Sequence, residues 1–206
     1  MIAVLDYGIG NLRSAEKALQ FLGADARLVS DPDEAAAAEA VVLPGVGSFG
    51  RCMEALRERG LDGVAQAAIS ESKPFLGICV GMQMLYEGSD ESPAVPGLGV
   101  FPGRVTRLPH GVKRPQMQWN RLSLIRADAP LLNGLGPDPW VYFVHSYAPP
   151  AGEVIVATCD YGGDVAAAAC CGRVWATQFH PEKSGATGLA ILANFVTAVR
   201  SAAESD

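Results

Sequence analysis

The stretch FLGICVGMQMLY, residues 75–86, combines an apolar run, a cysteine with a glycine two residues to either side, and a second apolar run. Residues 75–78 are typical of a buried strand, and residues 82–86 are helix-like. The glycines let strand and helix approach closely, so that Cys79 is held in a strained turn with its side chain projecting outward. The stretch therefore predicts a nucleophile elbow.

The helix that follows the elbow gives Cys79 two chemical advantages. Its N-terminus favours the thiolate, and the backbone N–H of Val80 is available to a developing oxyanion. A single cysteine is more often a small core residue than a nucleophile. Here the flanking glycines and the strand-to-helix context favour the catalytic interpretation.

Upstream of the elbow, short apolar runs alternate with helix-like segments. The runs 2–5, 26–29 and 40–43 are each followed by helical sequence, as at 12–22, and 61–70 is helix-like as well. This alternation predicts a parallel, doubly wound sheet.

Beyond Gly97 the sequence is β-rich, and we expect its pieces to extend the sheet in mixed sense. These pieces are 100–108, 119–125, 141–147, 154–159, 165–170 and 174–179. A last helix over 187–200 carries an apolar stripe that suits packing on the sheet. We predict one domain over residues 1–206, of the α/β class: a doubly wound, mostly parallel (mixed), flavodoxin-like sheet with flanking helices.

Composition excludes several classes of protein. The chain is 49% apolar and 18% charged, which is typical of a large buried core and not of disorder. A net charge of −6 and a pI near 5.1 argue against nucleic acid or anionic lipid as a partner. No basic leader opens the chain and no apolar run reaches the ~18–20 residues that cross a bilayer, so we expect a cytoplasmic protein.

The cysteines indicate neither a disulfide framework nor a zinc site. There are five of them, an odd number, and no C-x-x-C pair occurs. We therefore expect reduced thiols, any one of which could be catalytic, and no metal or other cofactor.

A nucleophilic cysteine needs a base, and the chain has three histidines: His110, His145 and His180. Pro181 biases His180 towards an extended conformation, in which residues 180 and 182 face the same way. Glu182 could then hold the imidazole in one tautomer, the third role in a Cys-His-acid set. By itself an H-P-E sequence is more often an exposed histidine beside an unrelated glutamate, but the elbow favours the catalytic interpretation. His110 lies in a predicted turn and is expected to be solvated.

The glycine-rich loop 44–50 follows the third strand, at the sheet edge where doubly wound folds place their sites. It could be a plain turn, or a phosphate cradle, although no lysine lies within it. A second oxyanion donor from Gly45 or Val46 suits the nearby cysteine best. Because glycines flank Val46, the Gly45–Val46 peptide could turn its N–H towards the site or away from it.

Five motifs together resemble a known family. They are DYGIGNLRS (6–14), PGVG (44–47), GICVGMQ (77–83), YFVHSY (142–147) and QFHPEKS (178–184). The chain resembles the class I glutamine amidotransferases and, among them, the glutaminase subunits of imidazole glycerol phosphate synthase in histidine biosynthesis. One departure is Gln118, in MQWN, where the family usually has glycine.

The resemblance implies a function and further site residues. Glutamine would be hydrolysed to glutamate and ammonia by Cys79, His180 and Glu182, and the ammonia would pass to a (β/α)₈-barrel cyclase subunit in a heterodimer. Side chains of Gln83 and Glu91 and backbone groups of Ser146 and Tyr147 would hold L-glutamine. Asn11, Tyr142 and Lys183 would lie towards the partner, and we add Trp119, a large aromatic in an otherwise polar segment.

Three other functions are less consistent with these residues. A glutaminase serving another synthase is disfavoured by the opening motif DYGIGN. A peptidase- or chaperone-type cysteine hydrolase typically has histidine directly after the elbow cysteine, where this chain has Val80. A non-catalytic binding module is opposed by the complete Cys79, His180 and Glu182 set.

Overall fold

The parallel half of the main sheet is built from strands that are almost wholly buried. The computed structural model describes residues 1–204. Five parallel strands lie side by side: β1 (Ile2–Leu5), β2 (Ala26–Val29), β3 (Ala40–Gly45), β4 (Phe75–Cys79) and β13 (Val174–Thr177). In β1, β3, β4 and β13 every residue is buried, as expected for strands covered on both faces.

Three antiparallel strands complete this sheet. They are β8 (Ser123–Leu124), β11 (Ile155–Asp160) and β12 (Asp164–Cys171), and the full order is β2-β1-β3-β4-β13-β12-β11-β8. The sheet is thus mixed and mainly parallel, and the predicted fold class is confirmed.

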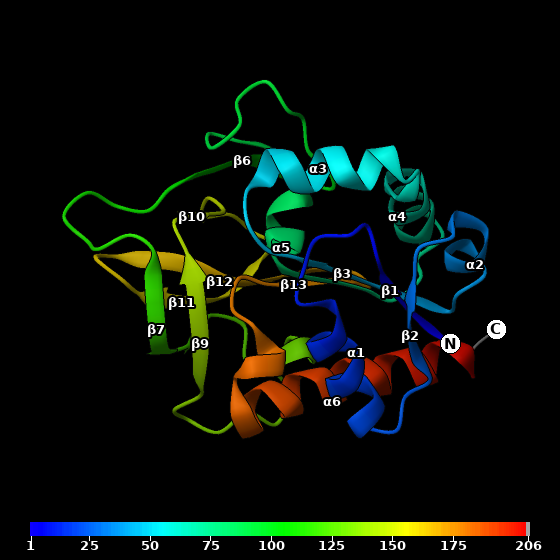
Figure 1. Cartoon of the computed structure of the whole chain (residues 1–206). Helices are drawn as coiled ribbons and strands as arrows, with labels where there is room; N and C mark the ends of the chain where they lie inside the picture. The colour runs from blue at the N-terminus through cyan, green and yellow to red at the C-terminus, as the bar shows by residue number, and fades with distance from the viewer. Residues whose placement is uncertain (205–206) are drawn as a thin grey trace.

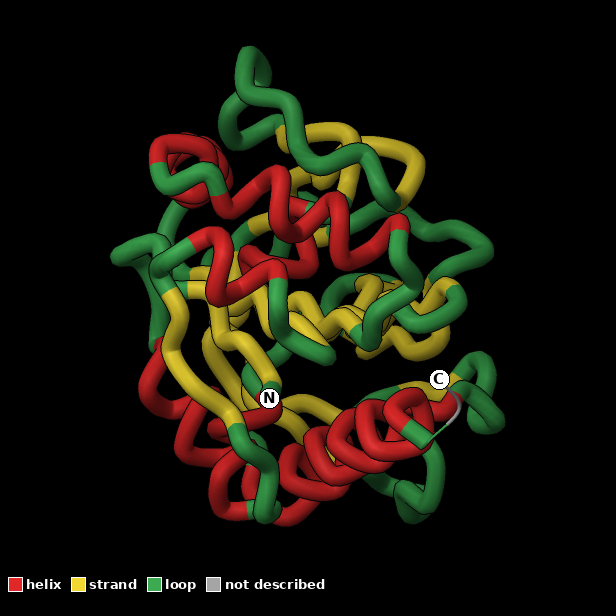
Figure 2. Tube along the Cα trace, turned by 90° about the vertical axis from the view of Figure 1, so that its right-hand side faces the viewer, coloured by secondary structure: helices red, strands yellow, loops and turns green. Residues whose placement is uncertain are grey.

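Helices cover both faces of the sheet. Above it in Figure 1 lie α3 (Phe49–Glu58), α4 (Leu61–Ser70) and α5 (Val80–Met84), and below it lie α1 (Leu12–Phe21) and α6 (Gly185–Ala203). Short α2 (Pro32–Ala36) lies near α4, and two 3₁₀ turns are η1 (Pro130–Leu132) and η2 (Pro181–Lys183). Figure 2 shows the same layers from the side, with strands between helices.

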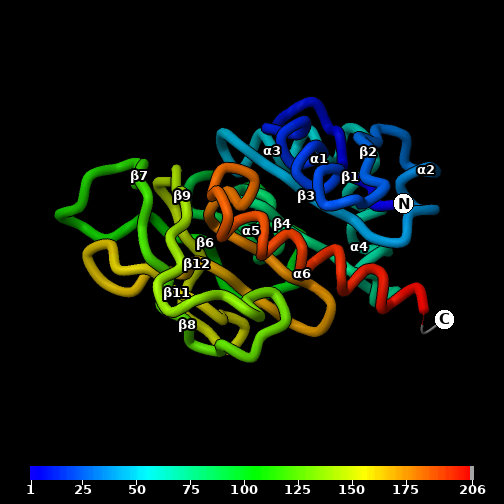
Figure 3. The backbone as a smooth tube through the Cα atoms, turned by 90° about the horizontal axis from the view of Figure 1, so that it is seen from below, coloured from blue at the N-terminus to red at the C-terminus, as the bar shows by residue number. Residues whose placement is uncertain are grey.

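Helix α6 is long and apolar enough, by length and composition, to cross a membrane: it has 19 residues and a mean hydropathy of 1.3. One of its faces is buried, however, and Phe195 packs edge-on against Trp175 of β13. Its other face carries polar groups, among them Asn194, which donates to the carbonyl of Leu131 in η1 and to that of Asn133 just after it. These contacts make α6 a core helix, and in Figure 3, which is seen from below, it crosses in front of the sheet.

The expectation that every β-rich piece extends the main sheet is wrong. A three-stranded sheet joins β10 (Tyr147–Ala148), β6 (Phe101–Arg107) and β5 (Tyr86–Ser89). A two-stranded ribbon joins β7 (Gln116–Arg121) to β9 (Trp140–His145) and stands apart from the N-terminal helices in Figures 1 and 3. In β6 and β7 most residues are partly or fully exposed, so these strands cannot lie in a sheet that is covered on both faces.

Two boundaries also differ from those predicted. The helix after the elbow begins at Val80 and ends at Met84, and Tyr86, expected to be helical, opens β5 instead. Tyr86 is buried edge-on against Phe101 of β6, so its strand pairing prevails over helix continuation. The strand predicted to run up to His180 ends at Thr177.

Candidate active site

Cys79 occupies the tip of a strand-to-helix elbow. It is the last residue of β4 and precedes the first residue of α5, with φ 56° and ψ −111°. A non-glycine residue at positive φ is strained, and such strain concentrates at functional sites. Cys79 as a whole is 3% exposed.

The glycines around the elbow are required by close backbone contacts. A Cβ at Gly81 would lie 1.8 Å from the carbonyl oxygen of Leu43 in β3, and one at Gly77 would lie 2.9 Å from that of Gly81. Gly45, at the end of β3, is equally constrained, since its Cβ would lie 2.9 Å from the nitrogen of Gly81. The elbow thus packs directly against the glycine-rich loop.

His180 and Glu182 form a buried pair beside the elbow. Nδ1 of His180 lies 2.8 Å from Oε1 of Glu182, and both side chains are 2% exposed. Nε2 of His180 is buried and has no hydrogen-bond partner among the described residues. Burial alone would lower the pKa of His180, but its interactions with the neighbouring Cys79 and Glu182 outweigh burial and raise this pKa to about 10. His180 is therefore an imidazolium at neutral pH.

The route by which Glu182 reaches His180 differs from the one predicted. His180 is extended, as Pro181 requires, but Glu182 lies in the 3₁₀ turn η2 and not in a continuing strand. The turn curls the carboxylate back onto the imidazole. Ser184 fixes this geometry, because its hydroxyl donates to the carbonyl of His180 at 2.6 Å and accepts from the N–H of Tyr142 at 2.9 Å.

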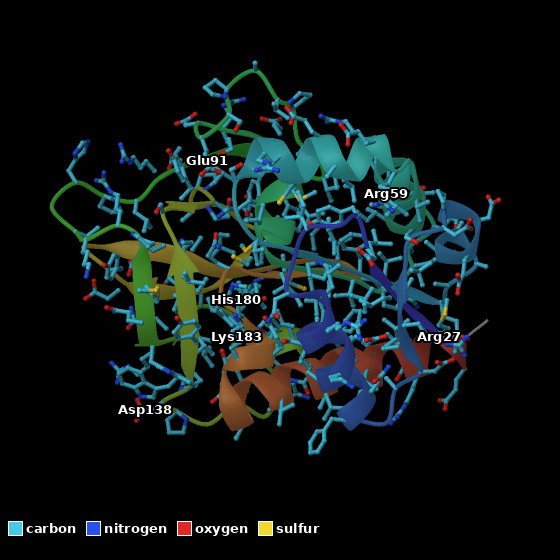
Figure 4. All side chains as sticks on the ribbon, in the orientation of Figure 1. Arg27, Arg59, Glu91, Asp138, His180 and Lys183 are labelled. Carbon is cyan, nitrogen blue, oxygen red and sulfur yellow. The ribbon has the colours of Figure 1, made fainter. Side chains whose placement is uncertain are left out.

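A cavity of about 280 Å³ opens in front of Cys79 and His180. Its lining includes the loop residues Val46 and Gly47, the elbow residue Val80, and Gln83, Glu91, His145, Ser146 and Tyr147. Figure 4 shows His180 with Lys183 close by, and Glu91 on the side of α3. The nucleophile, the imidazole and the residues expected to hold glutamine therefore share one cavity.

The structure limits how the expected glutamine-binding residues can act. Nε2 of Gln83 donates to the carbonyl of Tyr147 at 3.0 Å and to Oε1 of Gln178 at 3.0 Å, so only Oε1 of Gln83 remains for a ligand. Oε2 of Glu91 accepts from the N–H of Phe49 at 2.8 Å.

The backbone carbonyls at the other side of the cavity are already occupied. That of Ser146 accepts from Leu108, and that of Tyr147 accepts from Gln83 and faces Nδ1 of His145 at 2.8 Å. For a ligand, the N–H groups of Ser146 and Tyr147 are therefore better placed than their carbonyls.

Two side chains that the sequence did not single out donate hydrogen bonds to the end of β3 and to the loop that follows it. The hydroxyl of Tyr7 donates to the carbonyl of Pro44, and the thiol of Cys52 donates to that of Val46 at 3.2 Å. Burial raises the pKa of Cys52 to about 11, so this thiol stays protonated and remains a donor.

The four residues expected at a partner interface lie in different settings. Trp119 is 48% exposed and its ring lies edge-on to that of Tyr142 in the β7–β9 ribbon, while Lys183 is exposed. Asn11 instead donates to Oε1 of Glu182 at 3.2 Å, which places it on the acid of the triad. Met117 and Trp140, on the same ribbon, are 63% and 51% exposed.

The remaining histidine and the cysteines of residues 1–204 form no disulfide and no candidate metal site. His110 is exposed in a turn, and all five cysteines are free. No group of three or more His, Cys, Asp or Glu side chains that could hold a metal ion occurs within this range.

Comparison with known proteins agrees with this geometry. Residues 3–199 match the family described as glutamine amidotransferase class-I. The imidazole glycerol phosphate synthase subunit HisH of Methanothermobacter thermautotrophicus is 51% identical over 97% of this chain and 100% of its own length. HisH of Synechococcus elongatus is 48% identical over 98% of this chain and 94% of its own length.

Solved structures share the fold at lower identity. A glutamine amidotransferase crystal structure superposes with a TM-score of 0.74 at 24% identity, covering 95% of this chain and 98% of its own. PurLQS from Thermotoga maritima gives a TM-score of 0.75 at 21% identity, covering 96% and 97%. The cysteine elbow and the buried His-Glu pair agree with the family match, and about half of the residues are identical to HisH over nearly the full chain. The chain therefore belongs to the class-I glutamine amidotransferase family and, within it, to the HisH subunits of imidazole glycerol phosphate synthase.

Proposed function

We propose that this chain is the glutaminase subunit of an imidazole glycerol phosphate synthase, acting in the cytoplasm as one domain over residues 1–206. It hydrolyses L-glutamine and passes ammonia to a synthase subunit in histidine biosynthesis. The observation that carries this proposal is the convergence of Cys79 and the His180–Glu182 pair on one cavity. The HisH relatives, which match over nearly the full chain, support the choice of pathway.

The first half of the reaction forms a thioester. The thiolate of Cys79 attacks the side-chain amide carbon of glutamine, and the carbonyl oxygen becomes an oxyanion. The N–H of Val80 and one N–H from the Gly45–Val46 loop stabilise it, each such donor contributing ~2.7–4 kcal/mol. The C–N bond then breaks as His180, protonated at neutral pH, gives its proton to the departing ammonia.

The second half releases glutamate. The now neutral imidazole of His180 takes a proton from water, which attacks the thioester carbon. The C–S bond breaks and Cys79 leaves as the thiolate beside a protonated His180. Glu182 stabilises the imidazolium through Nδ1 in both halves.

The partner, we propose, is a (β/α)₈-barrel cyclase subunit that forms a heterodimer over the β7–β9 ribbon and η2. Bulk water would convert ammonia into non-nucleophilic ammonium, so the site needs a covered exit. The exposed aromatic side chains of Trp119 and Trp140 and the cation of Lys183 suit a face that is buried on assembly.

The decisive experiment compares nitrogen sources in the assembled complex. Cys79→Ala should abolish synthesis from glutamine but leave synthesis from ammonium salts largely intact, because the partner needs only free ammonia. Cys171→Ser, which changes an exposed thiol, is the matched control and should retain both activities. Glutamine hydrolysis at near the parent rate by Cys79→Ala would refute the assignment.

A further inference from the structure

A row of two buried amides lies directly behind the nucleophile. Gln178, which follows β13, is 0% exposed, and Gln83 of α5 is 3% exposed. Nε2 of Gln178 lies 3.9 Å from Sγ of Cys79, and its Oε1 accepts from Nε2 of Gln83 at 3.0 Å. The fold therefore brings the buried side chain of Gln178, 99 residues along the chain, to the sulfur.

The hydrogen-bond network fixes which end of each amide faces which neighbour. An amide nitrogen carries two donors, and both donors of Gln83 are used, one on the carbonyl of Tyr147 and one on Gln178. Nδ1 of His145 meets the same Tyr147 carbonyl at 2.8 Å. If the amide of Gln83 were flipped, its oxygen would face the carbonyl of Tyr147 and Oε1 of Gln178; if that of Gln178 were flipped, its nitrogen would face Nε2 of Gln83. The N–H of Gln178 is therefore held towards Cys79.

This donor matters because its opposite neighbour disfavours a negative sulfur. The carbonyl of Val144 lies 4.0 Å from Sγ of Cys79 and can accept from the thiol, but it repels a thiolate. Hydrogen bonding to the charged form of a group favours that form. The N–H of Gln178 supplies such a bond from within the protein, where no solvent competes for it.

We propose that Gln178 is a further catalytic residue of the glutaminase reaction: its side-chain amide donates to the thiolate sulfur of Cys79, and Gln83 is the positioning residue that holds this amide in place. The inference rests on the proposed function. The sulfur is negative before attack and again when it leaves the thioester, so the same N–H acts in both halves of the reaction. Gln83 lines the cavity, and its Oε1 stays available for the ligand while its nitrogen holds Gln178.

The test measures how fast iodoacetamide alkylates Cys79 as a function of pH in the full chain, with the Cys79 peptide quantified by mass spectrometry. Alkylation follows the thiolate fraction and needs neither glutamine nor a partner. Titratable groups that surround Cys79 stay unchanged in every variant; they are His180, Glu182, His145, Cys52, Tyr7 and Glu91.

Two substitutions separate a donor from a mere space-filler. Gln178→Met removes the donor and should move the midpoint of the alkylation profile up by about 1–2 pH units, the worth of one hydrogen bond to a charged group. Gln178→Asn keeps a neutral amide but shortens the side chain by one CH₂, which withdraws the N–H from the sulfur, so its midpoint should rise as well. This polar, uncharged variant keeps the test decisive if Gln178→Met does not fold.

Gln20→Met, in α1, is the matched control. Nε2 of Gln20 donates to the carbonyl of Ala26 at 2.8 Å, and Gln20 is not among the residues that line the cavity, so this variant removes an amide donor elsewhere and should leave the Cys79 midpoint unchanged. In the complex, Gln178→Met should lower kcat for glutamine about tenfold or more with KM little changed.

The two proposals fail in distinguishable ways. A Cys79 midpoint that is the same in the parent and in Gln178→Met or Gln178→Asn overturns the role of Gln178. A Cys79 that does not react with iodoacetamide in the parent overturns the proposed nucleophile, and the inference with it.

Discussion

His145 makes the stability of this protein sensitive to acid. The imidazole is 6% exposed, and burial, which is the largest cause, lowers its pKa from 6.5 to about 4. Its carbonyl contact with Tyr147 opposes this shift, and the charge of His180 adds to it. Between about pH 4 and pH 6.5, His145 is therefore protonated in the unfolded chain but neutral in the folded protein. Stability contributed by the neutral imidazole is therefore fully present above about pH 6.5 and is lost as pH falls towards 4.

The magnitude follows from the difference between the two pKa values. Each pKa unit corresponds to about 1.4 kcal/mol, so the contribution of His145 to the free energy of unfolding should fall by about 2–3 kcal/mol between pH 7 and pH 4.5. His145→Gln keeps a polar side chain that can donate to Tyr147 but cannot gain a charge. Its loss of stability over the same pH interval should be smaller than that of the parent by about this amount.

Urea unfolding at pH 7 and at pH 4.5, followed by the fluorescence of buried Trp175, measures both losses. Carboxylates also contribute to acid destabilisation, but equally in parent and variant, so the comparison isolates His145. The control is His110→Gln, which changes an exposed histidine in a turn. Its loss of stability between pH 7 and pH 4.5 should equal that of the parent. An equal loss in His145→Gln and in the parent would refute the reasoning.

Other outcomes follow from the site and its surroundings. Because the pKa of His180 is raised to about 10, the proton for departing ammonia stays available at neutral pH and is lost only above that value; kcat/KM for glutamine should fall on the alkaline side near pH 10, and a fall centred near 7 would contradict this. His180→Ala should lower kcat at least about a hundredfold and Glu182→Gln less, since the carboxylate only orients and stabilises the imidazole; the reverse order in steady-state assays would contradict the roles given. Gly81→Ala should yield little folded protein, because its Cβ would lie 1.8 Å from a β3 carbonyl, whereas Gly63→Ala in α4 meets open space and should keep or raise the Tm in thermal unfolding. Lys183→Glu should weaken binding of the synthase subunit in a titration, and an unchanged Kd would remove this residue from the interface.

Short-range patterns in the sequence determined the parallel half of the fold and the position of the nucleophile. The buried strands β1, β3 and β4 are continuous apolar runs, and the spacing of glycines around Cys79 predicts the elbow because both features depend on neighbouring residues alone. The pairing of His180 with Glu182 is also local, although a 3₁₀ turn brings the two side chains together where the sequence predicts an extended segment.

The tertiary structure alone decided which strands pair and which side chains meet across the chain. The pieces that form β6, β7 and β9 have strand-like sequences, but their choice between the main sheet and the smaller sheets depends on what covers their second face. Gln178 reaches Cys79 across 99 residues and Asn11 reaches Glu182 across 171. A polar side chain carries no local sign of its partner, because its hydrogen bond is fixed by backbone packing elsewhere, so only the folded chain reveals these contacts.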